Sequence, residues 1–114
     1  MRSKVTVEQL NQRVEVEEKI PESDEQGGFT DHWGPYLTIW AHVVPLLPLV
    51  GDEIWRVGEH FFSSRYSLWM RGEVPLKPGL RFRWKESLLY PVSMAVLIDN
   101  GRFQIVLTEK EGAR

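Results

Sequence analysis

The sequence predicts a mainly β fold, a small β-barrel of about six short antiparallel strands with a long insertion loop or arm. Hydrophobic and polar residues alternate along several short stretches, which is the period of a half-buried strand. Clusters of glycine and proline separate these stretches and favour tight turns between them. The chain has 114 residues, of which 42% are hydrophobic, and we therefore expect a single domain over residues 1–114.

The first expected hairpin is centred on Gly27-Gly28. Residues 13–20, which follow an N-terminal tail over residues 1–12, alternate so that Val14, Val16 and Ile20 face the same way, and Pro21 is expected to end that strand. Glycine accepts a positive φ without a Cβ clash, so the chain is expected to reverse at the two glycines. The strongest strand candidate of the chain then covers residues 37–44, which are rich in β-branched and aromatic side chains.

The C-terminal half predicts further short strands. Alternation returns over residues 66–70, 81–85 and 103–108, and Phe82 and Trp84 are expected to point inward. Residues 75–79 contain two prolines and a glycine and predict a turn, while Asp99-Asn100-Gly101 is typical of a hairpin. The largely apolar residues 91–98 complete the set of strands.

Residues 46–64 interrupt this pattern and are expected to form an insertion arm. Pro45 and Pro48 lie in an apolar run, where they argue against a central strand and against a helix interior. Within the arm, residues 52–62 allow either a short helix or an extended chain. So many apolar side chains predict that the arm either folds over the core or docks on a partner. The residues through which it would dock are Leu46, Leu47, Leu49, Val50, Asp52, Glu53, Ile54, Trp55, Glu59, Phe61 and Phe62.

Charge is unevenly distributed, although the net charge is only −2. Residues 1–31 carry four basic and eight acidic side chains, whereas residues 61–85 carry six basic side chains and one acidic one. The basic stretch fits three interpretations: a solvated strand pair, a nucleic-acid surface with Tyr66, Trp69 and Trp84 interleaved, or one half of a head-to-tail contact between copies. On the last interpretation the docking face comprises Arg65, Arg71, Arg81, Arg83 and Lys85.

No pattern in the sequence predicts catalysis. The chain has no cysteine and no Gly-x-Ser-x-Gly elbow, and His32, His42 and His60 lack metal-ligand spacing. Gly27-Gly28 lacks the residues of a phosphate-binding loop. We therefore expect a protein that is not an enzyme and that has no cofactor or metal. Since no apolar run approaches a membrane span and the N-terminus does not read as a signal peptide, we also expect a soluble, intracellular protein with no membrane contact.

Landmark residues follow one another along most of the chain, from about Arg13 to about Glu109. They are Asp24, Gly27-Gly28-Phe29-Thr30, Trp33, Trp40-Ala41, Val43, Pro45, Gly51, Arg65-Tyr66, Gly79, Arg81-Phe82 and Trp84. This ordered set resembles the phage head–tail joining proteins, the small head completion or stopper-type proteins of siphovirus-like particles and gene transfer agents. Residues 87–96 are more apolar than that pattern.

The resemblance implies a small β-barrel with a long insertion, built into a homo-oligomeric ring below the portal and its adaptor. Such a ring closes the DNA-filled head, receives the tail terminator or other tail proteins, and makes weak, non-specific contact with the double-stranded DNA that passes through it. It also implies a place at the head–tail interface of a particle assembled in the bacterial cytoplasm. The insertion would then be the 46–64 arm. Alternatives are an adaptor or tail-terminator ring and, from another class, a nucleic-acid-binding β-barrel.

Overall fold

The computed structural model describes residues 5–23, 27–46 and 65–111. The described chain is built from antiparallel strands and one short 3₁₀ helix, which confirms the predicted mainly β class. In chain order the elements are η1 (Val7–Gln9), β1 (Gln12–Ser23), β2 (Phe29–Pro45), β3 (Arg65–Arg71), β4 (Leu80–Trp84), β5 (Ser87–Pro91), β6 (Val96–Ile98) and β7 (Phe103–Lys110).

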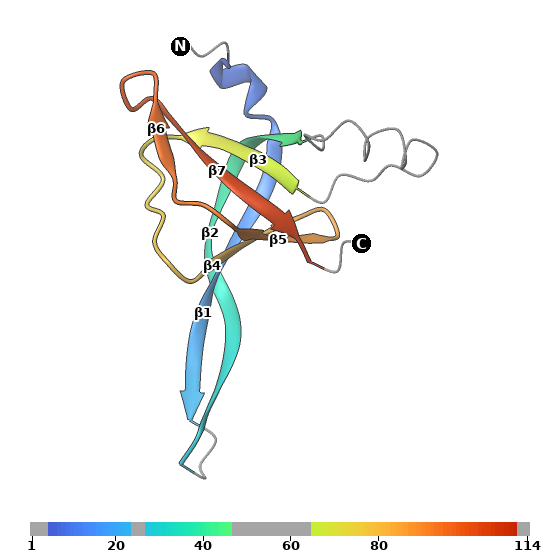
Figure 1. Ribbon diagram of the computed structural model, residues 1–114, viewed down its shortest axis with the longest axis vertical. Helices are drawn as coiled ribbons and strands as arrows, with labels where there is room; N and C mark the ends of the chain where they lie inside the picture. Colours follow the sequence, from blue (N-terminus) through green and yellow to red (C-terminus); the bar gives the residue numbers. More distant parts are fainter. Residues whose placement is uncertain (1–4, 24–26, 47–64, 112–114) are drawn as a thin grey trace, which may run out of the picture.

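Six of the strands close on themselves. The seven-stranded sheet has the order β3-β2-β1-β4-β5-β7-β6, and an additional pairing of β3 with β7 joins its two sides. The result is a barrel-like closed circuit of β3, β2, β1, β4, β5 and β7, which we call the strand ring (Figure 1). β6 lies outside this circuit and pairs only with β7 among the described strands.

β1 and β2 form a hairpin that is longer than predicted. It is paired from Gln12 opposite Ala41 to Ser23 opposite Phe29, and its far half projects beyond the strand ring (Figure 1). Gly27 has a φ of +88°, so the chain reverses where the glycine pair predicts.

The expectation that Pro21 ends the first strand is wrong, because β1 continues to Ser23. The Lys19 N–H points towards β4, where it donates to the Gly79 carbonyl at 3.0 Å. Alternation then points the nitrogen of Pro21 to the same side, beyond the end of β4. A proline there removes no ladder hydrogen bond, so pairing with β2 continues.

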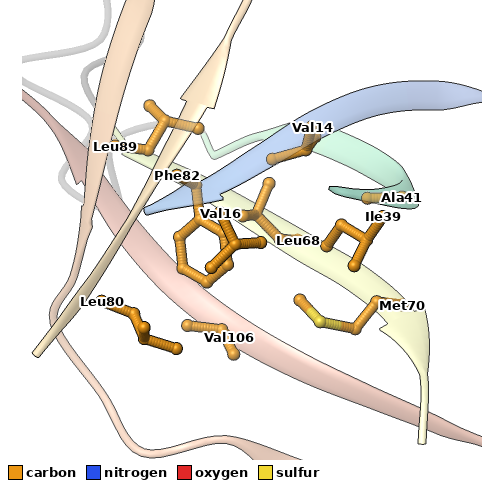
Figure 2. Packing of buried hydrophobic residues seen from close by; sticks show 10 residues of the cluster. All are labelled: Val14, Val16, Ile39, Ala41, Leu68, Met70, Leu80, Phe82, Leu89 and Val106. Atoms are coloured by element: carbon orange, nitrogen blue, oxygen red, sulfur yellow. The ribbon is translucent and has the colours of Figure 1, made fainter. Parts of the chain in front are cut away.

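The core lies inside the strand ring, where side chains from its six strands meet (Figure 2). Val14, Val16 and Phe82 are each no more than 1% exposed, as their alternation predicts. Trp84 is half-buried and packs against the same cluster. Full burial of one such side chain stabilises the fold by about 1.5–3 kcal/mol. The buried cluster comprises Val14, Val16, Ile39, Ala41, Leu68, Met70, Leu80, Phe82, Leu89 and Val106.

The apolar stretch 91–98 does not form one strand. β5 ends at Pro91, which pairs with Thr108, and β6 starts at Val96, which pairs with Ile105. Four residues, 92–95, therefore stand opposite two residues of β7, 106–107, and this part of the chain forms a bulge. The hairpin predicted at Asp99-Asn100-Gly101 is confirmed, since Ile98 pairs with Phe103 across it.

Candidate assembly surfaces

Arg81 on β4 is the centre of a polar cluster on the outer surface of the strand ring. Its Nε donates a hydrogen bond to Glu17 Oε1 at 2.7 Å, and its Nη1 donates to Tyr90 Oη at 3.1 Å. The guanidinium also lies over the ring of Trp33, 4.4 Å from the centroid. The Arg81 and Glu17 side chains are 13% and 19% exposed, so this ion pair is largely shielded from water.

Glu17 is shared by two arginines, because Arg83 Nε donates to its second oxygen at 3.2 Å. Register explains the arrangement, since Glu17 pairs with Arg81 across β1 and β4 and Arg83 is its diagonal neighbour on the same face. Partial burial acts to raise the pKa of Glu17, but the hydrogen bonds from Arg81 and Arg83 outweigh it, and the pKa lies below its ordinary value. The cluster therefore holds one carboxylate ionised between two cations.

The predicted basic docking residues are divided between two walls. Arg81 and Arg83 lie on β4, whereas Arg65 and Arg71 lie at the two ends of β3, three steps away around the strand ring. Arg65 Nε donates to Glu109 Oε2 at 3.2 Å on an exposed surface. Lys85 occupies the β4–β5 turn, with its Nζ 4.9 Å from the centre of the Trp84 ring. Docking by these residues stays a prediction.

Most of the predicted arm lies outside the described residues. That part includes Leu47, Leu49, Val50, Asp52, Glu53, Ile54, Trp55, Glu59, Phe61 and Phe62. Leu46 is described: it is half-buried, and its N–H donates to the Arg65 carbonyl at 2.9 Å. Pro45, the residue before Leu46, pairs with Tyr66. Residues 47–64 are therefore inserted between two strands whose ends are hydrogen-bonded to each other.

The three aromatic residues of the nucleic-acid alternative do not share one surface. Tyr66 and Trp84 pack against the core and contact each other edge to face, with centroids 5.4 Å apart. Trp84 Nε1 also donates to Gln12 Oε1 at 3.1 Å. Trp69 instead contacts His42, at a centroid distance of 6.5 Å. Base stacking needs accessible ring faces along one groove, which this arrangement does not provide.

An apolar groove opens beside the N-terminal end of β4, where its pairing with β5 has ended, and sequence reasoning missed it. We call it the side groove. Its volume is about 760 Å³. Its two sides are residues 76–80 and residues 91–95, and core residues Phe82 and Val106 lie at its base.

Pro91 provides the physical reason for the opening. β4 and β5 pair from Trp84 opposite Ser87 to Phe82 opposite Leu89, so the next hydrogen-bonded pair would join Leu80 to Pro91. Proline has no N–H, and the Leu80 carbonyl cannot be satisfied there. The ladder stops at Phe82, and the wall separates beyond it.

The rim of the side groove is apolar and exposed. Val92 is 53% exposed and Met94 is 87% exposed, and Val96 and Leu97 on β6 are both more than half exposed. Leu107, whose N–H donates to Ser93 Oγ at 3.2 Å, adds a further exposed side chain beside the bulge. A continuous apolar surface of this kind marks an interaction site more often than a free surface.

The described residues offer little for catalysis or metal binding. They contain no group of three or more histidine, cysteine or carboxylate side chains arranged to hold a metal ion. Among the same residues, no helix has the length and apolar character needed to cross a membrane.

Comparison with known proteins identifies a similar fold and a family. The solution structure of protein SF1141 from Shigella flexneri 2a is similar in fold, with a TM-score of 0.70 over 96% of this chain and 100% of that one. At 14% sequence identity, this likeness concerns the fold alone. No curated protein matches the sequence.

The sequence profile of the family described as phage head completion protein matches residues 5–111, which cover the strand ring, the projecting hairpin and the insertion between β2 and β3. Membership implies a structural part of a phage particle that contacts other virion components. The chain belongs to the phage head completion protein family.

Proposed function

We propose that this chain is the stopper-type subunit of the head–tail connector. Copies form a subunit ring below the portal and its adaptor, close the DNA-filled head and provide the surface on which the tail docks. The observation that carries the proposal is the family match over residues 5–111 together with an 18-residue insertion between hydrogen-bonded strand ends.

The strand ring supports this role because it is a closed scaffold. Pairing of β3 with β7 closes the circuit of the six strands, and the insertion starts from two of them. A segment held at both ends by Leu46 and Arg65 can extend into a channel while the scaffold stays in place.

The proposed mechanism involves no bond chemistry. Each subunit donates residues 47–64 to the lumen, and the segments together constrict the channel against the packaged DNA. The acidic side chains of the segment, Asp52, Glu53 and Glu59, repel phosphate, so the duplex is retained by obstruction and can later pass. An electrostatic grip strong enough to retain DNA would also impede its ejection.

Deletion of the gene from a phage or prophage that encodes this chain tests the role. The proposal predicts DNA-filled or leaking heads together with free tails of normal length, and rescue by the intact gene. Intact infectious particles would contradict it. Free tails of abnormal length would favour the tail-terminator alternative, because a terminator ends tail-tube growth.

A second experiment tests how the head is closed. A variant with residues 47–64 replaced by a short Gly-Ser linker is expected to yield heads that leak DNA. Purified full-length chain should show only weak, salt-sensitive binding to duplex DNA in fluorescence anisotropy. Tight binding at physiological salt would contradict an obstructive mechanism and favour the nucleic-acid-binding alternative.

A further inference from the structure

The side groove has the features of a site for an added strand. The Leu80 carbonyl lacks a strand partner because proline stands at position 91. Beyond the 91–95 side of the groove, Val96 and Ile98 direct their backbone groups to β7, so alternation points the N–H and C=O of Leu97 to the open side of β6. Among the described residues, an extended peptide in the groove therefore meets the unpaired Leu80 carbonyl, and a peptide that continues past residue 95 meets the open edge of β6.

The direction of the β6 backbone groups follows from the hydrogen bonds of β7. The Gly72 N–H donates to the Arg102 carbonyl at 2.8 Å, which places alternate residues of β7 in hydrogen-bonded pairs with β3. The backbone groups of the residues between them, including Ile105 and Leu107, point away from β3. The hydrogen bond from the Val92 N–H to the Leu107 carbonyl agrees with this direction. β6 therefore presents an unpaired edge outward.

The side chains of the groove set a second requirement for the segment that binds there, in addition to backbone pairing. The base of the groove consists of core residues Phe82 and Val106, and the rim carries Val92 and Met94, both more than half exposed. Backbone pairing provides affinity in strand addition, while pockets for alternate side chains provide selectivity. The site therefore suits an extended segment with large apolar side chains.

The chain itself contains such a segment. Residues 47–64 include Leu47, Leu49, Val50, Ile54, Trp55, Val57, Phe61 and Phe62. Doubled back on itself between two hydrogen-bonded ends, an 18-residue segment can extend about 30 Å from its base. The strand ends at Leu46 and Arg65 lie on the side of the strand ring away from β6 (Figure 1), which favours the groove of another molecule over its own.

We propose that the side groove binds residues 47–64 of a second copy of this chain by strand addition. Each copy then donates one segment and accepts one, a head-to-tail contact that generates a closed ring when the rotation between copies closes. This inference rests on the proposed function, since it describes how the subunit ring forms. During assembly, the same residues that later constrict the channel would first join neighbouring subunits.

Engineered cysteines provide the test, because the natural chain contains none and every disulfide joins introduced cysteines. Each variant oxidised alone gives the background of dimers that a variant forms with itself. One full-length variant carries Met94→Cys on the groove rim, and a second carries Leu49→Cys, Val50→Cys, Ile54→Cys or Trp55→Cys in the segment. The two are mixed, oxidised mildly and separated on a non-reducing gel. We expect a disulfide-linked dimer for at least one segment position.

A matched control replaces Met94→Cys with Trp40→Cys. Trp40 is 58% exposed on β2 and does not line the groove, so it reports random collision at a comparably accessible site. Dimer yield should be roughly tenfold higher with Met94→Cys, as expected for a contact stabilised by about 1.4 kcal/mol. Equal yields from the two sites would overturn the proposal.

Placing both cysteines in one chain tests whether the segment in the groove comes from the same molecule or from a second copy. If Met94→Cys and Val50→Cys combined in a single molecule give only an oxidised monomer, the segment occupies its own groove and the second-copy assignment is wrong. A failed cross-link alongside leaking heads in the deletion strain would reject the groove contact and leave the stopper role standing. The two proposals therefore fail separately.

A backbone variant provides an independent readout. Pro91→Val restores an N–H opposite the Leu80 carbonyl and is expected to extend the β4–β5 ladder by one hydrogen bond. We expect the new amide at position 91 to exchange slowly with solvent and the Met94→Cys cross-link to weaken severalfold. A protected amide with an unchanged cross-link yield would contradict strand addition at this edge.

Discussion

The two edges of β4 differ in how their surroundings are satisfied. Towards β1, the strand is paired from Leu80 to Arg83, and its outward-facing arginines share Glu17. Towards β5, pairing stops at Phe82, and apolar side chains line the opening that follows. On the β1 side, the arginines are paired with a carboxylate of the same chain. On the β5 side, apolar side chains remain open to solvent. Polar contacts can thus hold the fold without taking part in an interface.

Phe82 belongs to both sides of this comparison, and its removal should have the largest effect. It is 1% exposed in the core and also lies at the base of the side groove. Phe82→Ala is expected to lower the free energy of unfolding by about 3–5 kcal/mol, because a large cavity replaces packed atoms. Urea denaturation followed by circular dichroism measures the change. A loss below about 1 kcal/mol would mean that the core collapses around the site.

The charged side of the comparison is tested by Glu17→Gln. Arg81 is then left largely shielded from water without a carboxylate partner, and we expect a loss of about 1–3 kcal/mol in the free energy of unfolding. Glu109→Gln is the matched control, because its ion pair with Arg65 is exposed on both sides and exposed pairs are worth less than about 1 kcal/mol. Similar losses in the two variants would show that shielding of the Glu17 pair contributes nothing.

The same carboxylate predicts a pH dependence. The pKa of Glu17 is lower in the folded chain than in the unfolded one, so its contribution to stability is fully present above the unfolded value of about 4.3. That contribution is lost as the pH falls through the folded-state pKa. The difference in unfolding free energy between the natural chain and Glu17→Gln should therefore shrink as the pH is lowered from neutral into the range below about 4.3. A difference that stays constant over this range would assign the effect to packing.

The open side should respond least in stability. Met94 is 87% exposed, and Met94→Ser is expected to change the free energy of unfolding by less than about 0.5 kcal/mol. The same variant should reduce association of purified full-length chains by roughly tenfold if apolar contact at the groove rim joins copies. Sedimentation velocity over a concentration series measures the association. Unchanged association together with unchanged stability would leave the rim without a role in assembly.

Features determined by neighbours along the chain could be predicted from the sequence. Alternation placed Val14, Val16 and Phe82 in the core, and the two glycines and Asp99-Asn100-Gly101 marked hairpins. In each case the relevant interaction lies within a few residues, or the side chain follows the two-residue period of its own strand. The mainly β class followed from these features.

Features determined by pairing between distant strands could not be predicted from the sequence. Glu17 and Arg81 are 64 residues apart, and nothing in the local pattern of either strand predicts that they meet. The length of β1 depended on which way the Pro21 nitrogen points, and the side groove depended on Pro91 falling opposite Leu80. Each requires the register between strands, which one sequence does not reveal. The basic residues at 65–85 illustrate the same limit, because Arg65 and Arg71 lie on a different wall from Arg81 and Arg83.

The hydrogen bond between the Leu46 N–H and the Arg65 carbonyl has a consequence for how such proteins diversify. The strand ring requires only that these two residues are joined by the chain. The entropy cost of closing a connection rises only slowly with its length. Evolution can therefore exchange or lengthen the insertion while the scaffold stays unchanged. The same property makes this position a natural junction for chimeras that carry the insertion of another phage.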